Sequence, residues 1–194
     1  MRIARENRVR WILQIAFLTE EAAVPSIANS KAPKALDGHV LSHFRDIRLV
    51  RNLGRRAGLP VRVFDEPFRH SERTGYLTRA RDAIRKQRTE ETGIVLLDPD
   101  TGLSERPRQE HVSPEEVRGV WCELHPGDWL LLYQHADRTR SWKPRHRDEF
   151  ASAVQGVPVD TLWSPDGAKD VALFAAEKPG ANGRGTPRHT GRRA

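Results

Sequence analysis

The chain has 194 residues and a mass of 22.1 kDa, with 37% hydrophobic and 30% charged residues. This length is typical of one domain with a sizeable core. A single cysteine excludes a disulfide framework, and no Cys/His spacing resembles a structural zinc site.

The formal net charge of +7 is concentrated at the C-terminal end. Residues 178–194 contain five Lys or Arg residues and no acidic residue, which leaves 28 basic and 26 acidic residues in the rest of the chain. This segment has almost nothing to bury, so we predict a disordered basic tail. The balanced remainder does not by itself indicate a polyanion partner.

The first predicted strand is Val9–Thr19, in which apolar residues alternate from Trp11 to Phe17. Its short apolar run also resembles a secretory signal, but acidic residues flank it on both sides. No apolar run approaches the roughly 20 residues of a membrane helix. We therefore expect a cytoplasmic protein that does not enter the membrane.

Strands and helices alternate along the rest of the chain. A long loop over residues 20–38 leads to a helix over residues 40–57. The further elements are predicted as a strand at Val61–Phe64, a helix at Thr74–Arg88, a strand at Gly93–Asp98, a helix capped by Ser113, a strand at Asp128–Gln134, a helix at Arg145–Val154, and two strands, Val157–Trp163 and Lys169–Ala175, joined by a hairpin turn at residues 164–167.

This order predicts the fold class α/β. Residues 1–177 should form one Rossmann-like domain, a three-layer αβα sandwich. Its sheet should be mostly parallel and should end in a C-terminal antiparallel hairpin, because only a turn-forming segment separates the last two strands.

Ligands of such sheets bind at the carboxyl ends of the strands, where three predicted strands are followed by polar residues. Six residues occupy these strand ends: Asp65, Glu66, Asp98, Asp100, His135 and Arg138. We expect them to converge on one site.

Asp98 and Asp100 flank Pro99, and such a pair can hold Mg²⁺ or Mn²⁺ or accept a proton from an amine. The alternative is a turn with an Asx cap. His135 could be a general base or metal ligand, or a structural histidine. Arg138 could bind a phosphate or carboxylate, or be a surface arginine.

The segment from Arg138 to Arg147 contains five basic residues, Trp142 and no acidic residue. Such a composition suits a single-stranded or flipped-base substrate that stacks on the ring. The alternative is a solvated basic loop with Trp142 turned inward. No glycine-rich phosphate-binding loop follows the first strand.

The stretch from Gly93 to Ala175 resembles the second half of class I S-adenosylmethionine-dependent methyltransferases, which have a strand ending in Asp-Pro and a final antiparallel hairpin. In the amino methyltransferases of that class the acid contacts the target amine, and Asp98-Pro99 matches the motif. Residues 9–175 also resemble a bacterial protein family with no established reaction, through the words Phe64-Asp65-Glu66-Pro67, Asp98-Pro99-Asp100-x-Gly102-Leu103 and Tyr133-Gln134-His135-x-x-Arg138.

Three functional hypotheses follow. The first is a methyltransferase-like enzyme acting on nucleic acid, in which S-adenosylmethionine is the cofactor, Asp98 engages the target group and His135 assists proton transfer. The second is a metal-dependent phosphoesterase or nuclease with Asp98, Asp100 and His135 as ligands of a divalent metal. The third is a non-catalytic remnant that binds a partner.

Overall fold

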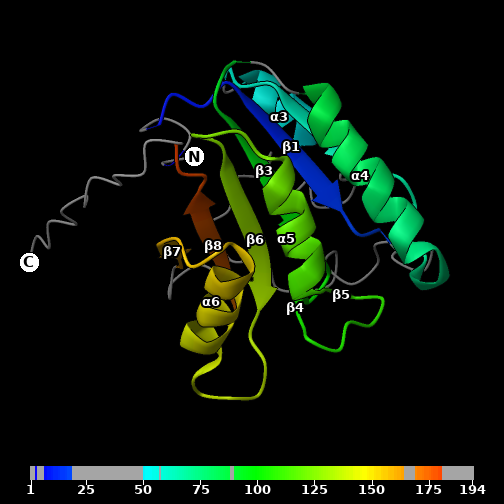
Figure 1. Ribbon diagram of the computed structural model, residues 1–194, viewed down its shortest axis with the longest axis vertical. Coiled ribbons are helices and arrows are strands. Elements are labelled where there is room, and N and C mark those ends of the chain that lie inside the picture. The colour runs from blue at the N-terminus through cyan, green and yellow to red at the C-terminus, as the bar shows by residue number, and fades with distance from the viewer. Residues whose placement is uncertain are drawn as a thin grey trace, which may run out of the picture.

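The computed structural model describes residue 3 and residues 7–18, 50–56, 58–87, 90–163 and 169–180. These residues form a six-stranded, mostly parallel sheet with helices on both faces (Figure 1), which confirms the predicted Rossmann-like α/β fold. The sheet strands are β1 (Trp11–Ala16), β2 (Val61–Phe64), β3 (Gly93–Asp98), β6 (Trp129–His135), β7 (Val159–Leu162) and β8 (Val171–Glu177).

The strands lie in the order β2-β1-β3-β6-β8-β7. The first four are parallel, and β8 pairs antiparallel with both β6 and β7, which confirms the predicted antiparallel pair. From β1 the chain moves to β2 on one side and then to β3 on the other. The order therefore reverses between β1 and β3, the position at which α/β sheets bind ligands.

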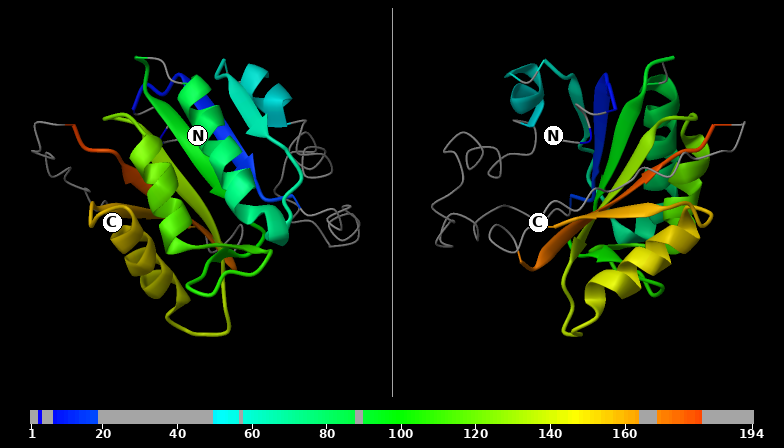
Figure 2. Two further views of the ribbon diagram at one scale, coloured as in Figure 1. Left: turned by 45° about the vertical axis from the view of Figure 1, so that its right-hand side comes forward. Right: turned by 90° about the vertical axis from the view of Figure 1, so that its left-hand side faces the viewer.

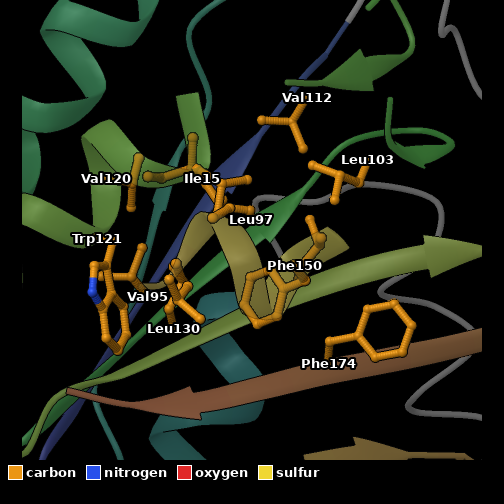
Figure 3. Packing of buried hydrophobic residues seen from close by; sticks show 14 of the residues in the cluster. Ile15, Val95, Leu97, Leu103, Val112, Val120, Trp121, Leu130, Phe150 and Phe174 are labelled. Carbon is orange, nitrogen blue, oxygen red and sulfur yellow. The ribbon is translucent and has the colours of Figure 1, made fainter. Parts of the chain in front are cut away.

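Three helices, α4 (Arg73–Gln87), α5 (Pro114–Glu123) and α6 (Trp142–Ala153), cover one face of the sheet. The short helix α3 (Val50–Arg56) lies on the opposite face (Figure 2). Figure 3 shows the core beneath α5 and α6, where Val95, Leu97 and Leu130 of the sheet meet Trp121 and Phe150 of the helices. We call this the first face; Ile94, Trp129 and Leu131 point to the second face.

Two short parallel strands, β4 (Gly102–Leu103) and β5 (His111–Val112), and a 3₁₀ turn at His70–Glu72 were not predicted. Helix α6 begins at Trp142 rather than Arg145, because Pro144 falls in the first turn, where the missing N–H is tolerated. The predicted loop at 20–38, most of the helix at 40–57, the turn at 164–167 and tail residues 181–194 lie outside the described residues.

The first residue of the predicted tail, Lys178, is held by the domain. Its backbone exchanges hydrogen bonds with Gly127 (2.8 Å) and Asp128 (2.7 Å). Its ammonium donates to the carbonyl of Trp121 at 3.0 Å and lies 4.6 Å from the centre of that ring. Lys178 thus fastens the end of β8 to the C-terminal turn of α5. Within the described residues, no helix is long and apolar enough to cross a membrane.

Candidate functional site

Four polar side chains lie on the second face of the sheet, close to the carboxyl ends of three neighbouring strands. They are Gln14 on β1, Asp98 on β3, and Tyr133 and His135 on β6. Gln14 pairs with Leu96, so Asp98 is the next residue along β3 on the same face. Extending the β3–β6 register by one residue places Tyr133 beside Asp98. We call these four residues the Asp98 cluster.

Asp98 is fixed by a buried neighbour. Gln14 is 8% exposed, and its Nε2 donates a hydrogen bond of 2.6 Å to Oδ2 of Asp98. Within the described residues, no backbone N–H of the following turn donates to the Asp98 carboxylate. The side chain therefore does not act as an Asx cap, and its second oxygen remains available to accept a hydrogen bond.

Opposing influences act on the protonation of Asp98. Burial is the largest and raises the pKa of its carboxyl group. The hydrogen bond from Gln14 lowers this pKa, the charge of Asp100 raises it and His135 lowers it, and the net effect is a raised pKa. Asp98 therefore binds a proton more readily than an ordinary aspartate.

Tyr133 and His135 form a pair beside Asp98. The phenol oxygen of Tyr133 lies 3.0 Å from Nε2 of His135, and the direction of this hydrogen bond depends on the histidine tautomer. Burial and the charges of Asp98 and Asp100 raise the pKa of Tyr133 to about 12, so the phenol keeps its proton at neutral pH. The cluster thus combines a carboxyl group with two groups that can hold or pass a proton.

A structural clamp on the first face positions the turn after β3. Oε1 of the buried Gln134 accepts a hydrogen bond of 2.8 Å from the N–H of Leu103, and the N–H of His135 donates to the carbonyl of Thr101 at 2.8 Å. Gly102 has φ +127°, and a Cβ there would lie 2.3 Å from Oε1 of Gln134. Gly102 and Gln134 therefore serve the geometry of the turn.

The acids after β2 lie two strands from Asp98, about 10 Å away at ordinary strand spacing. Glu66 forms an ion pair of 2.6 Å with Arg79, and Asp65 lies 3.7 Å from Arg51. They share the same sheet edge, and the charges of Glu66 and Asp98 both contribute to the raised pKa of Tyr76, after the larger effect of burial. The structure does not bring them into the Asp98 cluster.

The two residues predicted to bind substrate beyond β6 are placed differently. Arg138 is exposed in the loop between β6 and α6. Trp142 is only 7% exposed and packs in the first-face core. Its side chain is therefore turned inward, as in the second of the two alternatives, and its ring is not open for stacking.

The donor set for a metal is incomplete. Asp100 is exposed, and within the described residues no three His, Cys, Asp or Glu side chains gather in a way that could hold a metal ion. The described residues therefore do not fit the three-ligand set of Asp98, Asp100 and His135, and the phosphoesterase or nuclease hypothesis stays a prediction.

Sequence reasoning identified Asp98 and His135 but missed Gln14 and Tyr133. Gln14 carried a usable signal, because it is the single polar residue within the apolar run Trp11–Leu18. Tyr133 appeared only as the first residue of the word Tyr133-Gln134-His135-x-x-Arg138, and nothing local linked it to its neighbour Asp98, which is 35 residues away in sequence.

Comparisons with known proteins add no relative: neither the protein-family models, nor the curated proteins, nor the solved structures gave a match to the chain.

Proposed function

We propose that this protein is an enzyme that engages an amino group of its substrate at Asp98 and removes a proton from it. The observation that carries the proposal is the buried carboxyl group of Asp98, which has a raised pKa and is held by Gln14 where the strand order reverses. A general base works best when its pKa approaches the working pH, and burial moves Asp98 in that direction.

The proton transfer involves the second oxygen of Asp98, which Gln14 leaves available. The amino nitrogen uses its lone pair to bond to an electrophilic carbon of a second substrate, and the leaving group departs from that carbon with its bonding electron pair. The N–H bond then breaks, its electron pair stays on nitrogen, and the proton binds Asp98. His135 and Tyr133, joined by their 3.0 Å contact, lie beside Asp98, and His135 is the group in this proposal that takes up the proton when it leaves the carboxyl group. In this scheme His135 assists proton transfer, as the sequence hypothesis holds.

The substrate class in this proposal is a nucleobase that carries an exocyclic amino group. The resemblance to amino methyltransferases supports an amine at Asp98-Pro99, and the paired β7 and β8 beside β6 support the same comparison. Methyl transfer would require S-adenosylmethionine, which supplies an electrophilic methyl group.

The described residues after β1 and β2 do not fit that cofactor. Phe17 is 4% exposed and its ring packs 5.0 Å from that of Phe68, and the carbonyl of Leu18 accepts a hydrogen bond from the N–H of Phe68. These contacts fill the edge between the two strands with apolar side chains. No step is therefore assigned to S-adenosylmethionine, and methyl transfer stays a prediction.

Paired nucleosides test the amino-group proposal directly. Cytidine and uridine differ in whether position 4 of the ring carries an amino group. In NMR titrations of the full chain, cytidine should shift the signals of Gln14, Tyr133 and His135, and uridine should not. Asp98→Leu keeps the branched shape of the side chain but removes the acceptor, and it should weaken cytidine binding roughly tenfold or more, the cost of a charged hydrogen bond.

Asp100→Leu is the matched control, because it removes a carboxylate two residues away at an exposed position. It should bind cytidine nearly as well as the wild type. Equal responses to cytidine and uridine, or undiminished cytidine binding by Asp98→Leu, would contradict the proposal.

A further inference from the structure

The segment between β6 and α6 has cations in excess of its acids. Residues 137–149 contain five Lys or Arg residues and three acidic residues. All three acids are paired inside the segment: Asp137 and Glu149 with Arg145 and His146, and Asp148 with Arg147. Among the described residues, Arg138, Arg140 and Lys143 have no carboxylate partner.

An aromatic ring lies against this segment, but it is Trp163 rather than Trp142. Trp163 follows β7 and is 42% exposed, which makes it the exposed large hydrophobic side chain of the described residues. The Nζ of Lys143 lies 3.1 Å from the centre of its ring. Nε1 of Trp163 donates a hydrogen bond of 3.0 Å to the carbonyl of Lys169, which fixes the orientation of the ring.

Trp163 and the free cations belong to the same edge of the sheet. Leu162 and Tyr133 both pair with Leu173, so the next residue after β7 lies near the end of β6, where the loop with Arg138 and Arg140 begins. Figure 1 shows this loop below the end of β6, next to α6. A fixed, exposed ring and three cations without a carboxylate partner, one of which lies over that ring, thus occur together at the edge that also carries the Asp98 cluster.

We propose that Trp163, Lys143, Arg138 and Arg140 form a binding surface for single-stranded nucleic acid. One base stacks on the face of the Trp163 ring opposite the ammonium of Lys143, and Arg138 and Arg140 contact the phosphates. Proteins that bind single strands combine these two features, because every base has a face that can stack and the cations follow the backbone. A duplex keeps its bases stacked on one another and offers no free face to the ring. This surface goes beyond the reaction proposed for Asp98 and does not depend on it.

Binding of a fluorescein-labelled oligothymidylate of 12 nucleotides to the full-length chain, followed by fluorescence anisotropy, tests the stacking. Trp163→Leu keeps an apolar side chain but removes the ring, and it should raise the Kd roughly 5- to 150-fold. Trp163→Phe keeps a ring and should retain most of the affinity. Thermal melts establish that both variants are folded. The residues after Lys178 contain no Trp, Tyr or Phe and are the same in both variants, so the tail cannot produce this difference.

Salt dependence tests the phosphate contacts. Arg138→Ala combined with Arg140→Ala should reduce the slope of log K against log salt by about 1.4, because each single-strand phosphate contact contributes roughly 0.7. Arg62→Ala combined with Arg118→Ala removes the same charge from exposed positions on β2 and α5 and should change the slope by much less.

Three results would overturn the proposal. The first is undiminished affinity of Trp163→Leu, and the second is tighter binding of a duplex than of the single strand. The third is that polyglutamate competes as well as an unlabelled single strand does, because the surface would then recognise negative charge alone. Thymine has no exocyclic amino group, so Asp98→Leu should bind the oligothymidylate as the wild type does. That result separates a failure of this surface from a failure of the proposed function.

Discussion

The carboxyl group of Asp98 is largely buried and feels the charge of the exposed Asp100, and only Gln14 donates a hydrogen bond to it among the described residues. Burial of a charge lowers stability unless hydrogen bonds or ion pairs compensate. One hydrogen bond leaves the compensation incomplete, so the raised pKa of Asp98 also means a cost in stability when the group is ionised. A residue kept under these conditions is typical of a functional site.

Asp98→Asn should therefore stabilise the protein at neutral pH, by roughly 1–2 kcal/mol. The folded state binds more protons than the unfolded chain between the unfolded pKa of about 3.9 and the raised folded pKa. Stability consequently falls as the pH rises through this window, and the advantage of Asp98→Asn should disappear as the pH falls towards about 4. Urea unfolding of both proteins at several pH values measures this. A variant that is less stable than the wild type at neutral pH would refute it.

The clamp between Gly102 and Gln134 gives a second prediction. Gly102→Ala adds a Cβ 2.3 Å from the Gln134 carboxamide in a backbone conformation that disfavours side chains, and it should cost about 3 kcal/mol or more. Gly156→Ala is the control, because Gly156 also has positive φ but no atom within 4 Å of the new Cβ. It should cost about 1–2 kcal/mol. Equal losses in denaturant unfolding would show that the clamp is not tight.

Residue types at strand ends were enough to predict Asp98, Asp100 and His135 as candidates, but not how they are grouped. The grouping depends on which face of the sheet each residue points to, and that depends on strand register. Asp65 and Glu66 follow the edge strand, and Trp142 points into the core because α6 starts three residues earlier than predicted. Register and helix starts of this kind are set by tertiary packing.

At the scale of elements, local signals worked where the stabilising contacts are local. Helix α5 begins at Pro114, as predicted from Ser113, and the capping box with Glu116 is formed. Glu116 also receives a bidentate ion pair from Arg73 of α4, whose Nη2 donates to the carbonyl of His111 at 2.6 Å. The second role joins residues 43 apart in sequence, so no local pattern could indicate it.

Arg73→Ala should therefore be strongly destabilising. Arg73 and Glu116 are each 13% exposed, and removing one partner leaves an uncompensated buried charge, at a cost of about 3 kcal/mol. Arg79→Ala breaks the pair with Glu66, in which both side chains are more than 40% exposed, and should cost less than about 1 kcal/mol. If chemical denaturation gave the two variants similar stabilities, Arg73 would not be the link between α4, α5 and β5.

At the scale of the whole molecule, alternating strands and helices were sufficient for the fold class, because covered parallel strands leave few alternatives. Strand β8 lies between β6 and β7 and pairs with both. The sequence pattern predicts that the last two strands pair with each other, but it does not specify which of them lies beside β6. The contacts of Lys178 with Gly127, Asp128 and Trp121 were also not indicated, since a lysine followed by proline and glycine has the composition of a tail.

A chain that ends at Glu177 should accordingly melt below a chain that ends at Gly180. The shorter chain lacks the two backbone hydrogen bonds and the ammonium contact of Lys178. At roughly 1 kcal/mol or less for each, the loss is about 2 kcal/mol, or about 4–8 °C in Tm for a protein of this size. Coincident melting curves in calorimetry would show that Lys178 adds nothing to the domain.

The pKa of Asp98 itself tests the central claim, that the Asp98 cluster is built to take up a proton. A pH titration of the side-chain carboxyl carbon by ¹³C NMR measures it directly in the folded protein. The pKa should lie above the ordinary aspartate value of about 3.9, rise further in Gln14→Leu, which lacks the hydrogen bond that lowers it, and fall in Asp100→Asn. A pKa of Asp98 at or below about 3.9 in the wild type would identify an ordinary structural carboxylate and contradict the account.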